Sequence, residues 1–86
     1  MSREASLMQV KVYAPTRVYF DAKAASLSAA NETGPFDILP GHKNFMTLLS
    51  PCNLTVRVPQ RLDFNLPIDR GVMHVKANRI TVFLDI

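Results

Sequence analysis

Apolar and polar side chains alternate along most of this chain, and this alternation limits the fold more than any other feature of the sequence. Clear examples are Val10 and Val12 around Lys11, and Leu54 and Val56 around Thr55. A period of two residues puts successive side chains on opposite faces of a β-strand. No apolar pattern with helical spacing is long enough to predict a convincing helix. The sequence therefore predicts an all-β protein.

Turn signals separate the alternating runs at intervals of about 8–12 residues, as in β-sandwiches and β-barrels. The predicted turns lie at 15–16, 31–35, 59–61 and 77–78. From Ala25 to Ala29, Ala25, Leu27 and Ala29 alternate with Ser26 and Ser28. The small residues on both faces favour a strand covered on both sides and leave a short helix as an alternative. Another alternating run contains Leu62, Phe64, Leu66 and Ile68. Pro67 near its end implies a strand at a sheet edge or a bulge.

The alternation also predicts the core, because one face of each strand must be buried. The side chains expected to point inward are Val10, Val12, Leu27, Ile38, Leu54, Val56, Phe64, Leu66, Val75, Val82 and Leu84. With 86 residues the chain can form one small domain. We place that domain at residues 7–86 and expect the polar segment 1–6 to be disordered.

Residues 34–51, GPFDILPGHKNFMTLLSP, form the stretch most typical of a binding surface. Pro40 has a fixed φ and cannot donate to a β-ladder, whereas Gly41 admits a positive φ. This pair predicts a sharp bend with His42 and Lys43 on its outside. Apolar residues on both sides would hold the bend in place: Phe36, Ile38 and Leu39 before it, and Phe45, Met46, Leu48 and Leu49 after it. Loops held in this way are common binding sites.

The sequence does not favour catalysis or a cofactor. Cys52 and the two histidines, His42 and His74, have no spacing typical of a nucleophilic site or a zinc site. With three glycines in total, the chain offers no phosphate-binding loop. No apolar run approaches the roughly 20 residues of a membrane-spanning helix, and the single cysteine fits a reducing compartment. We therefore predict a non-enzymatic binding protein without a metal or cofactor.

Nucleic-acid binding is the main alternative that the residues leave open. The net charge of +3 is mildly basic, and an OB-like barrel that binds single strands has about this size. Such barrels stack bases on aromatic side chains that share one sheet face. Here Tyr13, Tyr19 and Phe83 are dispersed over three predicted strands, so the pattern offers little support for this alternative.

The central stretch resembles the signature of the N-terminal β-sandwich domain of the F-type ATP synthase epsilon subunit. That family carries G-x-[FL]-x-I-[LY]-P-G-H-x-x-[LF]-x-T-x-[LI]-x-P at this place. Residues 10–20 resemble its opening strand-turn-strand, including Pro15-Thr16. Residues 69–86, DRGVMHVKANRITVFLDI, resemble its closing hairpin. The resemblance covers essentially residues 7–86.

This resemblance implies a flattened sandwich of about ten short, mostly antiparallel strands at the foot of a rotating central stalk. It implies a non-catalytic subunit that docks on the gamma subunit and on the polar loops of the c-ring, and that reaches the catalytic head only indirectly. Such a subunit couples proton or sodium translocation to ATP synthesis. It lies peripherally on the cytoplasmic face of the bacterial cell membrane, is held there only through the complex, and binds no nucleic acid.

Residue by residue, the resemblance assigns two contact sets. The positions that match the gamma-facing segment are His42, Asn44 and Thr47. The positions that match the loop facing the c-ring are Glu32, Thr33, Gly34 and Pro35.

The chain also departs from the family pattern. Pro35 stands where the family often has an acidic residue, Cys52 where it prefers glycine, and Arg70 where it prefers the first of two glycines. The family normally continues into a two-helix hairpin that inhibits ATP hydrolysis in many bacteria and binds ATP in some. If 86 residues is the natural length, the resemblance implies coupling without inhibition and without nucleotide binding.

Overall fold

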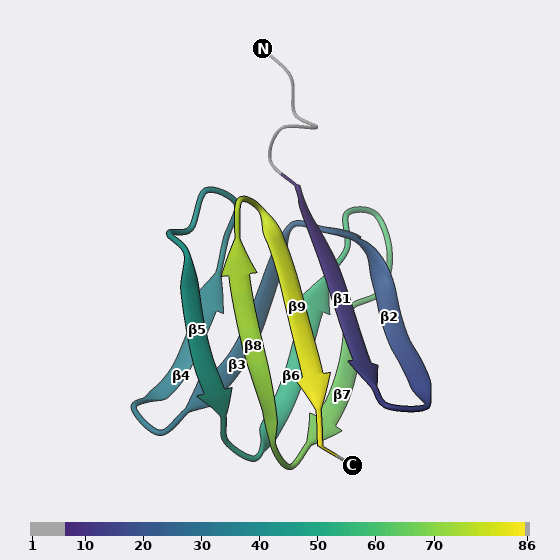
Figure 1. Cartoon of the computed structure of the whole chain (residues 1–86). Coiled ribbons are helices and arrows are strands. Elements are labelled where there is room, and N and C mark those ends of the chain that lie inside the picture. The colour runs from purple at the N-terminus through teal and green to yellow at the C-terminus, as the bar shows by residue number, and fades with distance from the viewer. Residues whose placement is uncertain (1–6, 86) are drawn as a thin grey trace.

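The computed structural model describes residues 7–85, and these residues form nine β-strands and no helix (Figure 1). The predicted disordered segment 1–6 lies outside the described residues. The strands are β1 (Met8–Ala14), β2 (Arg17–Ala24), β3 (Ser26–Asn31), β4 (Gly34–Ile38), β5 (Phe45–Leu49), β6 (Cys52–Arg57), β7 (Phe64–Ile68), β8 (Gly71–Lys76) and β9 (Arg79–Leu84). The all-β prediction is confirmed, with nine strands in the described part where about ten were expected. The stretch around Leu27 is a strand, not a short helix.

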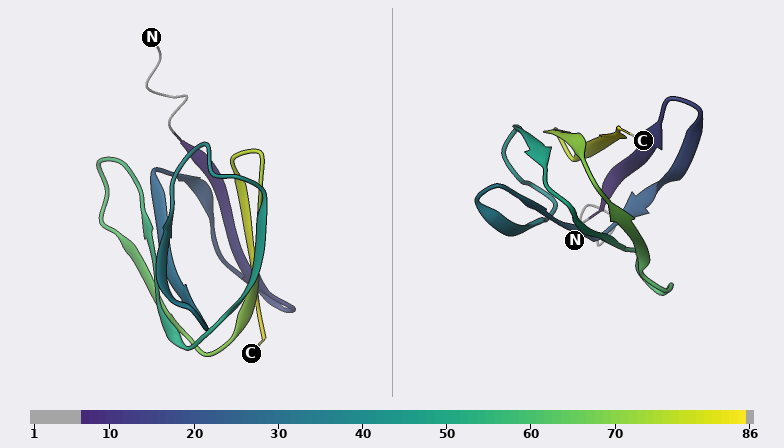
Figure 2. Two further views of the ribbon diagram at one scale, coloured as in Figure 1. Left: turned by 90° about the vertical axis from the view of Figure 1, so that its left-hand side faces the viewer. Right: turned by 90° about the horizontal axis from the view of Figure 1, so that it is seen from below.

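The strands form two sheets packed face to face (Figures 1 and 2). The five-stranded sheet has the order β2-β1-β9-β8-β5, and the four-stranded sheet has the order β4-β3-β6-β7. All pairs are antiparallel except β1 with β9. The molecule measures 40 × 24 × 19 Å, which agrees with the predicted flattened sandwich. Among the described residues there is no helix long and apolar enough to cross a membrane.

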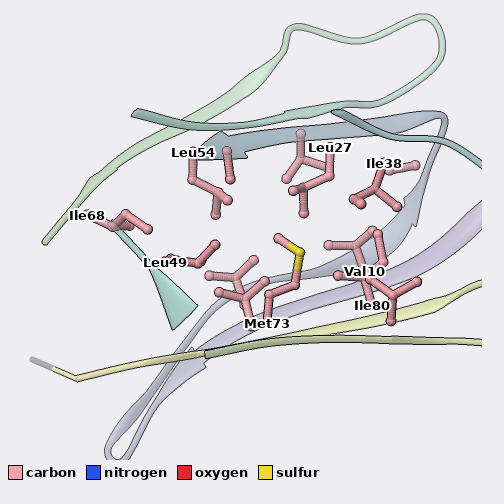
Figure 3. Packing of buried hydrophobic residues seen from close by; sticks show 14 of the residues in the cluster. Val10, Leu27, Ile38, Leu49, Leu54, Ile68, Met73 and Ile80 are labelled. Atoms are coloured by element: carbon pink, nitrogen blue, oxygen red, sulfur yellow. The ribbon is translucent and has the colours of Figure 1, made fainter. Parts of the chain in front are cut away.

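The core lies between the sheets and is made of buried apolar side chains from both of them (Figure 3). Nine of the eleven predicted inward residues are buried. The other two, Phe64 and Leu66, face the core but are only half-buried, because β7 is an edge strand and has no neighbour on its outer side. Pro67 lies on this edge strand, as the sequence predicted. The prediction omitted eight of the seventeen buried apolar residues of the described part, among them Met73 and Ile80 on central strands.

The turns determine where the strands begin. Ala77 and Asn78 have φ of 50° and 61°, which makes the β8–β9 connection a two-residue turn with positive φ at both positions. The β6–β7 connection is longer than predicted, since Gln60 has a φ of 62° and pairing resumes only at Phe64. The predicted strand start at Leu62 was therefore wrong, and this side chain is 93% exposed.

Gly71, at the start of β8, is required by close packing between strands. A Cβ atom added there would lie 2.8 Å from the backbone oxygen of Phe83 and 3.1 Å from a side-chain carbon of Leu84. Both residues belong to β9, which pairs with β8 through Gly71 and Leu84. Any other residue would force the central strands of the five-stranded sheet apart.

Candidate functional site

The two predicted contact sets lie on the same side of the sandwich, where β4 and β5 form the edges of the two sheets (left in Figure 1). The bend that carries His42 connects β4 to β5, and the turn that carries Glu32 and Thr33 connects β3 to β4. The two connections therefore lie at opposite ends of β4. A five-residue strand spans about 16 Å, which separates the two turns by roughly that distance.

The bend around His42 has the predicted form. Gly41 has a φ of 86°, and the His42 amide donates to the carbonyl oxygen of Leu39 at 3.1 Å. The Gly41 amide donates to Oδ1 of Asn78, 2.7 Å away in the β8–β9 turn. This second bond ties the bend to the five-stranded sheet, and His42 and Lys43 are exposed outside it, as predicted.

The His42 ring is held by its own loop. Its Nδ1 atom lies 2.8 Å from the carbonyl oxygen of Lys43, and since a carbonyl can only accept, this contact requires the proton on Nδ1. The ring centroid lies 5.5 Å from that of Phe45, which in turn lies 5.9 Å from that of Phe36 in an edge-on arrangement. The ring is thus fixed in orientation, with Nε2 left for a partner.

Thr47 is placed differently from His42. Its side chain is half-buried on the inner face of β5, where Oγ1 accepts a hydrogen bond from Nδ2 of Asn31 at 3.1 Å. Nearby, the Ser50 amide donates to the carbonyl oxygen of Ala30 at 3.0 Å. These two bonds join the two sheets along this side. Asn44, the third predicted gamma-facing residue, is exposed in the loop before β5.

The predicted c-ring loop is shorter in the structure. Only Glu32 and Thr33 form the turn, because Gly34 and Pro35 already pair with β3 as the first residues of β4. Gly34 has a φ of 127°, which favours glycine, and the Thr33 amide donates to Oδ1 of Asn31 at 2.9 Å. Glu32, Thr33 and Pro35 are exposed.

Two hollows run along this side, and together we call them the β4–β5 groove. The first, about 350 Å³, is lined by residues 33–38 with Asn31, His42 and Phe45. The second, about 520 Å³, is lined by residues 31–33 and 46–48. They share Asn31 and Thr33, and six of the seven predicted contact residues line one or both, the exception being Asn44.

The groove offers a binding surface, and no arrangement typical of catalysis is found in it. Its charged lining residues are Glu32 and Asp37, and no Lys or Arg lines either hollow. Within residues 7–85, no group of three His, Cys, Asp or Glu side chains is placed to hold a metal ion. Asp37 accepts a hydrogen bond from the Ser28 hydroxyl on the outer face of the four-stranded sheet. Acidic and apolar groups in an open groove are suited to docking another chain.

Comparison with known proteins identifies the domain. The family model of the ATP synthase delta/epsilon chain, β-sandwich domain, matches residues 7–86. The chain belongs to this family. The epsilon-family resemblance read from residues 34–51 is thereby confirmed.

Curated epsilon chains are similar over most of this chain. The ATP synthase epsilon chain 2 of Paraburkholderia xenovorans is 32% identical over 77 residues, which are 87% of this chain and 55% of that protein. The ATP synthase epsilon chain of Laribacter hongkongensis is 30% identical over 82 residues, 94% of this chain and 59% of that protein. The chain thus spans a little more than half the length of these relatives.

Solved structures share the fold. A chain in the cryo-EM structure of the Euglena gracilis mitochondrial ATP synthase OSCP/F1/c-ring matches with a TM-score of 0.85 at 16% identity, over 92% of this chain and 51% of that chain. A chain of the Tetrahymena thermophila mitochondrial ATP synthase central stalk and c-ring matches with a TM-score of 0.74 at 19% identity, over 90% and 62%. A nucleic-acid-binding barrel is not favoured by these matches.

Several residues of this candidate site were missed in the sequence. Asn31 and Asn78 hold the site together, but each acts on a residue far away in sequence. Met46 and Leu48 were taken as apolar anchors of the bend, whereas their side chains are 65% and 72% exposed. The period of two within β5 could have shown this exposure. If Phe45 and Leu49 point inward, Met46 and Leu48 must point outward.

Proposed function

We propose that this chain acts as the epsilon subunit of an F-type ATP synthase, docking on the gamma subunit and the c-ring at the foot of the central stalk. The observation that carries this proposal is the match of residues 7–86 to the family domain. In this role the subunit couples proton or sodium translocation to ATP synthesis. It contacts the catalytic head only indirectly and lies on the cytoplasmic face of a bacterial membrane through the complex.

The proposed role is mechanical and non-catalytic, and the fold is suited to it. A subunit that transmits torque must resist deformation, and two packed sheets with a close-packed core do so because protein interiors are dense and weakly compressible. The core here joins all nine strands: buried side chains such as Val12, Leu54 and Val82 lie on central strands of both sheets. Torque applied at one turn would therefore reach the other without bending the domain.

The placement of the two turns supports contact with two partners at once. His42 and Asn44 at one end of β4 would meet the gamma subunit, and Glu32 and Thr33 at the other end would meet the c-ring. The separation of about 16 Å leaves room for both. Thr47 would act in part indirectly, because its hydroxyl is engaged with Asn31 and its side chain is half-buried.

The gamma contact is tested by binding of the purified chain to its cognate gamma subunit, measured by calorimetry. We expect the double variant His42→Ala, Asn44→Ala to bind markedly more weakly, with its unfolding transition unchanged because both side chains are exposed. Asn65→Ala is the matched control, an exposed residue on β7 at the far side of the sandwich. Equal binding by the folded double variant would contradict the assignment.

The coupling role is tested by adding the chain to an ATP synthase complex depleted of its epsilon subunit. Restored ion pumping driven by ATP hydrolysis is the expected result. Failure of the wild-type chain to bind this complex would contradict the proposed function. The nucleic-acid alternative predicts salt-dependent binding to single-stranded oligonucleotides, so a gel shift at low salt would favour it instead.

A further inference from the structure

The four edge strands of the sandwich are not protected equally. An edge strand exposes unpaired backbone groups, and natural proteins shield such edges with prolines, bulges or charges. β4 carries Pro35 and β7 carries Pro67. β2 has a register shift opposite Val12 and Tyr13 and carries three exposed charged residues, Arg17, Asp21 and Lys23. β5, with the sequence FMTLL, has no proline, no charge and no register shift.

The register shows which residues of β8 point toward β5. In a two-residue hairpin the residues that flank the turn form a hydrogen-bonded pair, here Lys76 with Arg79. Backbone groups alternate in direction along a strand, so residues 72, 74 and 76 point to β9, and residues 71, 73 and 75 point to β5. Their partners on β5 are residues 49, 47 and 45.

The remaining backbone groups of β5, those of Met46 and Leu48, therefore point away from the sheet. Ser50 lies two residues after Leu48, so its amide should point the same way. It does point away from β8, because it donates to the carbonyl oxygen of Ala30 in the other sheet. The side chains of Met46 and Leu48 are 65% and 72% exposed on the outer face. The outer edge of β5 thus combines two outward amides with two exposed apolar side chains. The Leu48 carbonyl oxygen accepts from Thr47 Oγ1 at 3.3 Å and has a second lone pair for a partner.

The space beside this edge is open. The larger hollow of the β4–β5 groove, about 520 Å³, lies between residues 46–48 and the turn at residues 31–33. The edge also continues the segment assigned to the gamma contact, because Asn44 directly precedes β5 and Thr47 lies within it. An occupant of this edge would therefore extend the proposed gamma contact along β5.

We propose that the free edge of β5 binds an extended segment of the gamma subunit by β-strand addition. The added strand would pair with the backbone groups of Met46 and Leu48 and cover their side chains with apolar side chains of its own. Main-chain pairing supplies affinity in this mode of recognition, and alternate side chains supply specificity. The inference rests on the proposed function for the identity of the partner, and it adds the mode of binding.

The first test is amide hydrogen exchange of the chain with and without its cognate gamma subunit. Without gamma, the amides of Phe45, Thr47 and Leu49 should exchange slowly, and those of Met46 and Leu48 fast. With gamma bound, exchange at Met46 and Leu48 should slow by about tenfold or more, as expected when a free amide acquires a hydrogen bond. Unchanged exchange at both amides in the complex would overturn the proposal.

The second test removes one outward amide. Leu48→Pro deletes an N–H that has no partner in the isolated fold, a position where edge strands tolerate proline. We expect this variant to fold and to lose about tenfold or more of its affinity for gamma, and Leu48→Ala, which keeps the N–H, to lose less. Thr47→Pro would delete an amide that pairs with β8 and serves as the destabilised comparison. If Leu48→Pro does not fold, hydrogen exchange at Met46 and Leu48 in the wild-type complex tests the proposal instead.

The outcomes separate the two proposals. If gamma does not bind the wild-type chain, both the proposed function and the strand addition fail. If gamma binds wild type and folded Leu48→Pro equally, the proposed function stands and the strand addition is overturned. If the chain alone forms a dimer in ultracentrifugation that Leu48→Pro abolishes, the edge binds a second copy, and gamma is not its occupant.

Discussion

The two lateral sides of the sandwich are closed in different ways. On the β2–β7 side (right in Figure 1), the rings of Phe20 and Phe64 lie between the sheets with centroids 5.0 Å apart and planes tilted by 37°. On the β4–β5 side, Phe36 and Phe45 lie 5.9 Å apart in an edge-on arrangement at 77°. The first side contains a packed aromatic pair at a protected edge, whereas the second adjoins the open β4–β5 groove.

The difference shows how a small sandwich can leave one side accessible without losing its integrity. On the β4–β5 side the two sheets are joined by polar bonds, from Asn31 to Thr47 and from Ser50 to Ala30. Polar bonds are directional and need less apolar cover than ring packing, so they can hold two edges beside an open hollow. The β2–β7 side should therefore matter chiefly for stability, and the β4–β5 side chiefly for binding.

The largest expected effect is on the β2–β7 side, from Phe64→Ala. A fully buried phenylalanine replaced by alanine costs about 3–5 kcal/mol, and because Phe64 is only half-buried we expect about 2–3 kcal/mol. In a double-mutant cycle with Phe20→Ala, the coupling should be about 1 kcal/mol. Urea unfolding measures both. A loss below about 0.5 kcal/mol would show that the ring pair does not hold this side together.

The half-burial of Phe64 illustrates what the sequence can predict of the fold. The alternation identified the buried face of seven of the nine described strands, all except β2 and β5, because a period of two leaves only one choice of face. It does not show a strand's position in the sheet, so Phe64 and Leu66 on the edge strand β7 could not be told from Leu54 on central β6. Pro67 was the one local signal of an edge.

The candidate site was predictable where it depends on local geometry. Pro40 and Gly41 predicted the bend and the exposure of His42 from backbone preferences alone. Asn78 lies 37 residues from Gly41, and Asn31 lies 16 residues from Thr47, so neither contact has a local signal. The free edge of β5 likewise follows only from the order and register of the five-stranded sheet.

A smaller effect is expected from Asn78→Ala, which removes a support of the accessible side. Asn78 has a φ of 61° and accepts the hydrogen bond from the Gly41 amide. Alanine is strained at positive φ and lacks the acceptor, so we expect a loss of about 1–2 kcal/mol in stability together with weaker binding of gamma. Asn78→Gly relieves the strain but still lacks the acceptor, and Asn78→Asp retains it.

The three variants at this position separate backbone strain from support of the bend. Asn78→Gly should be nearly as stable as wild type and should still bind gamma weakly, whereas Asn78→Asp should bind normally. Thermal unfolding and calorimetric titration with gamma measure the two properties. Normal binding by a folded Asn78→Gly would show that the bend does not need this contact.

A smaller effect on stability is expected from removing the hydrogen bond between Asn31 and Thr47, which joins the two sheets. Thr47→Val keeps the shape of the side chain and removes the hydroxyl, and Asn31→Ala removes the donor. A double-mutant cycle by urea unfolding should give a coupling of about 0.5–1.5 kcal/mol, the usual net value of one hydrogen bond. This is comparable to the ring coupling on the other side. A coupling near zero would mean that the packing of β3 against β5 holds this side without the bond.

The smallest effect is expected from Leu62→Ser in the β6–β7 connection. The Leu62 side chain is 93% exposed and precedes the first paired residue of β7, so replacing it removes almost no buried apolar surface. Stability should stay within about 0.5 kcal/mol of wild type, and gamma binding should not change. The comparison of the two sides predicts this result, since the β2–β7 side is assigned no partner. Weaker binding of gamma by folded Leu62→Ser would place a partner on that side and would end the division of the sandwich into a stabilising side and a binding side.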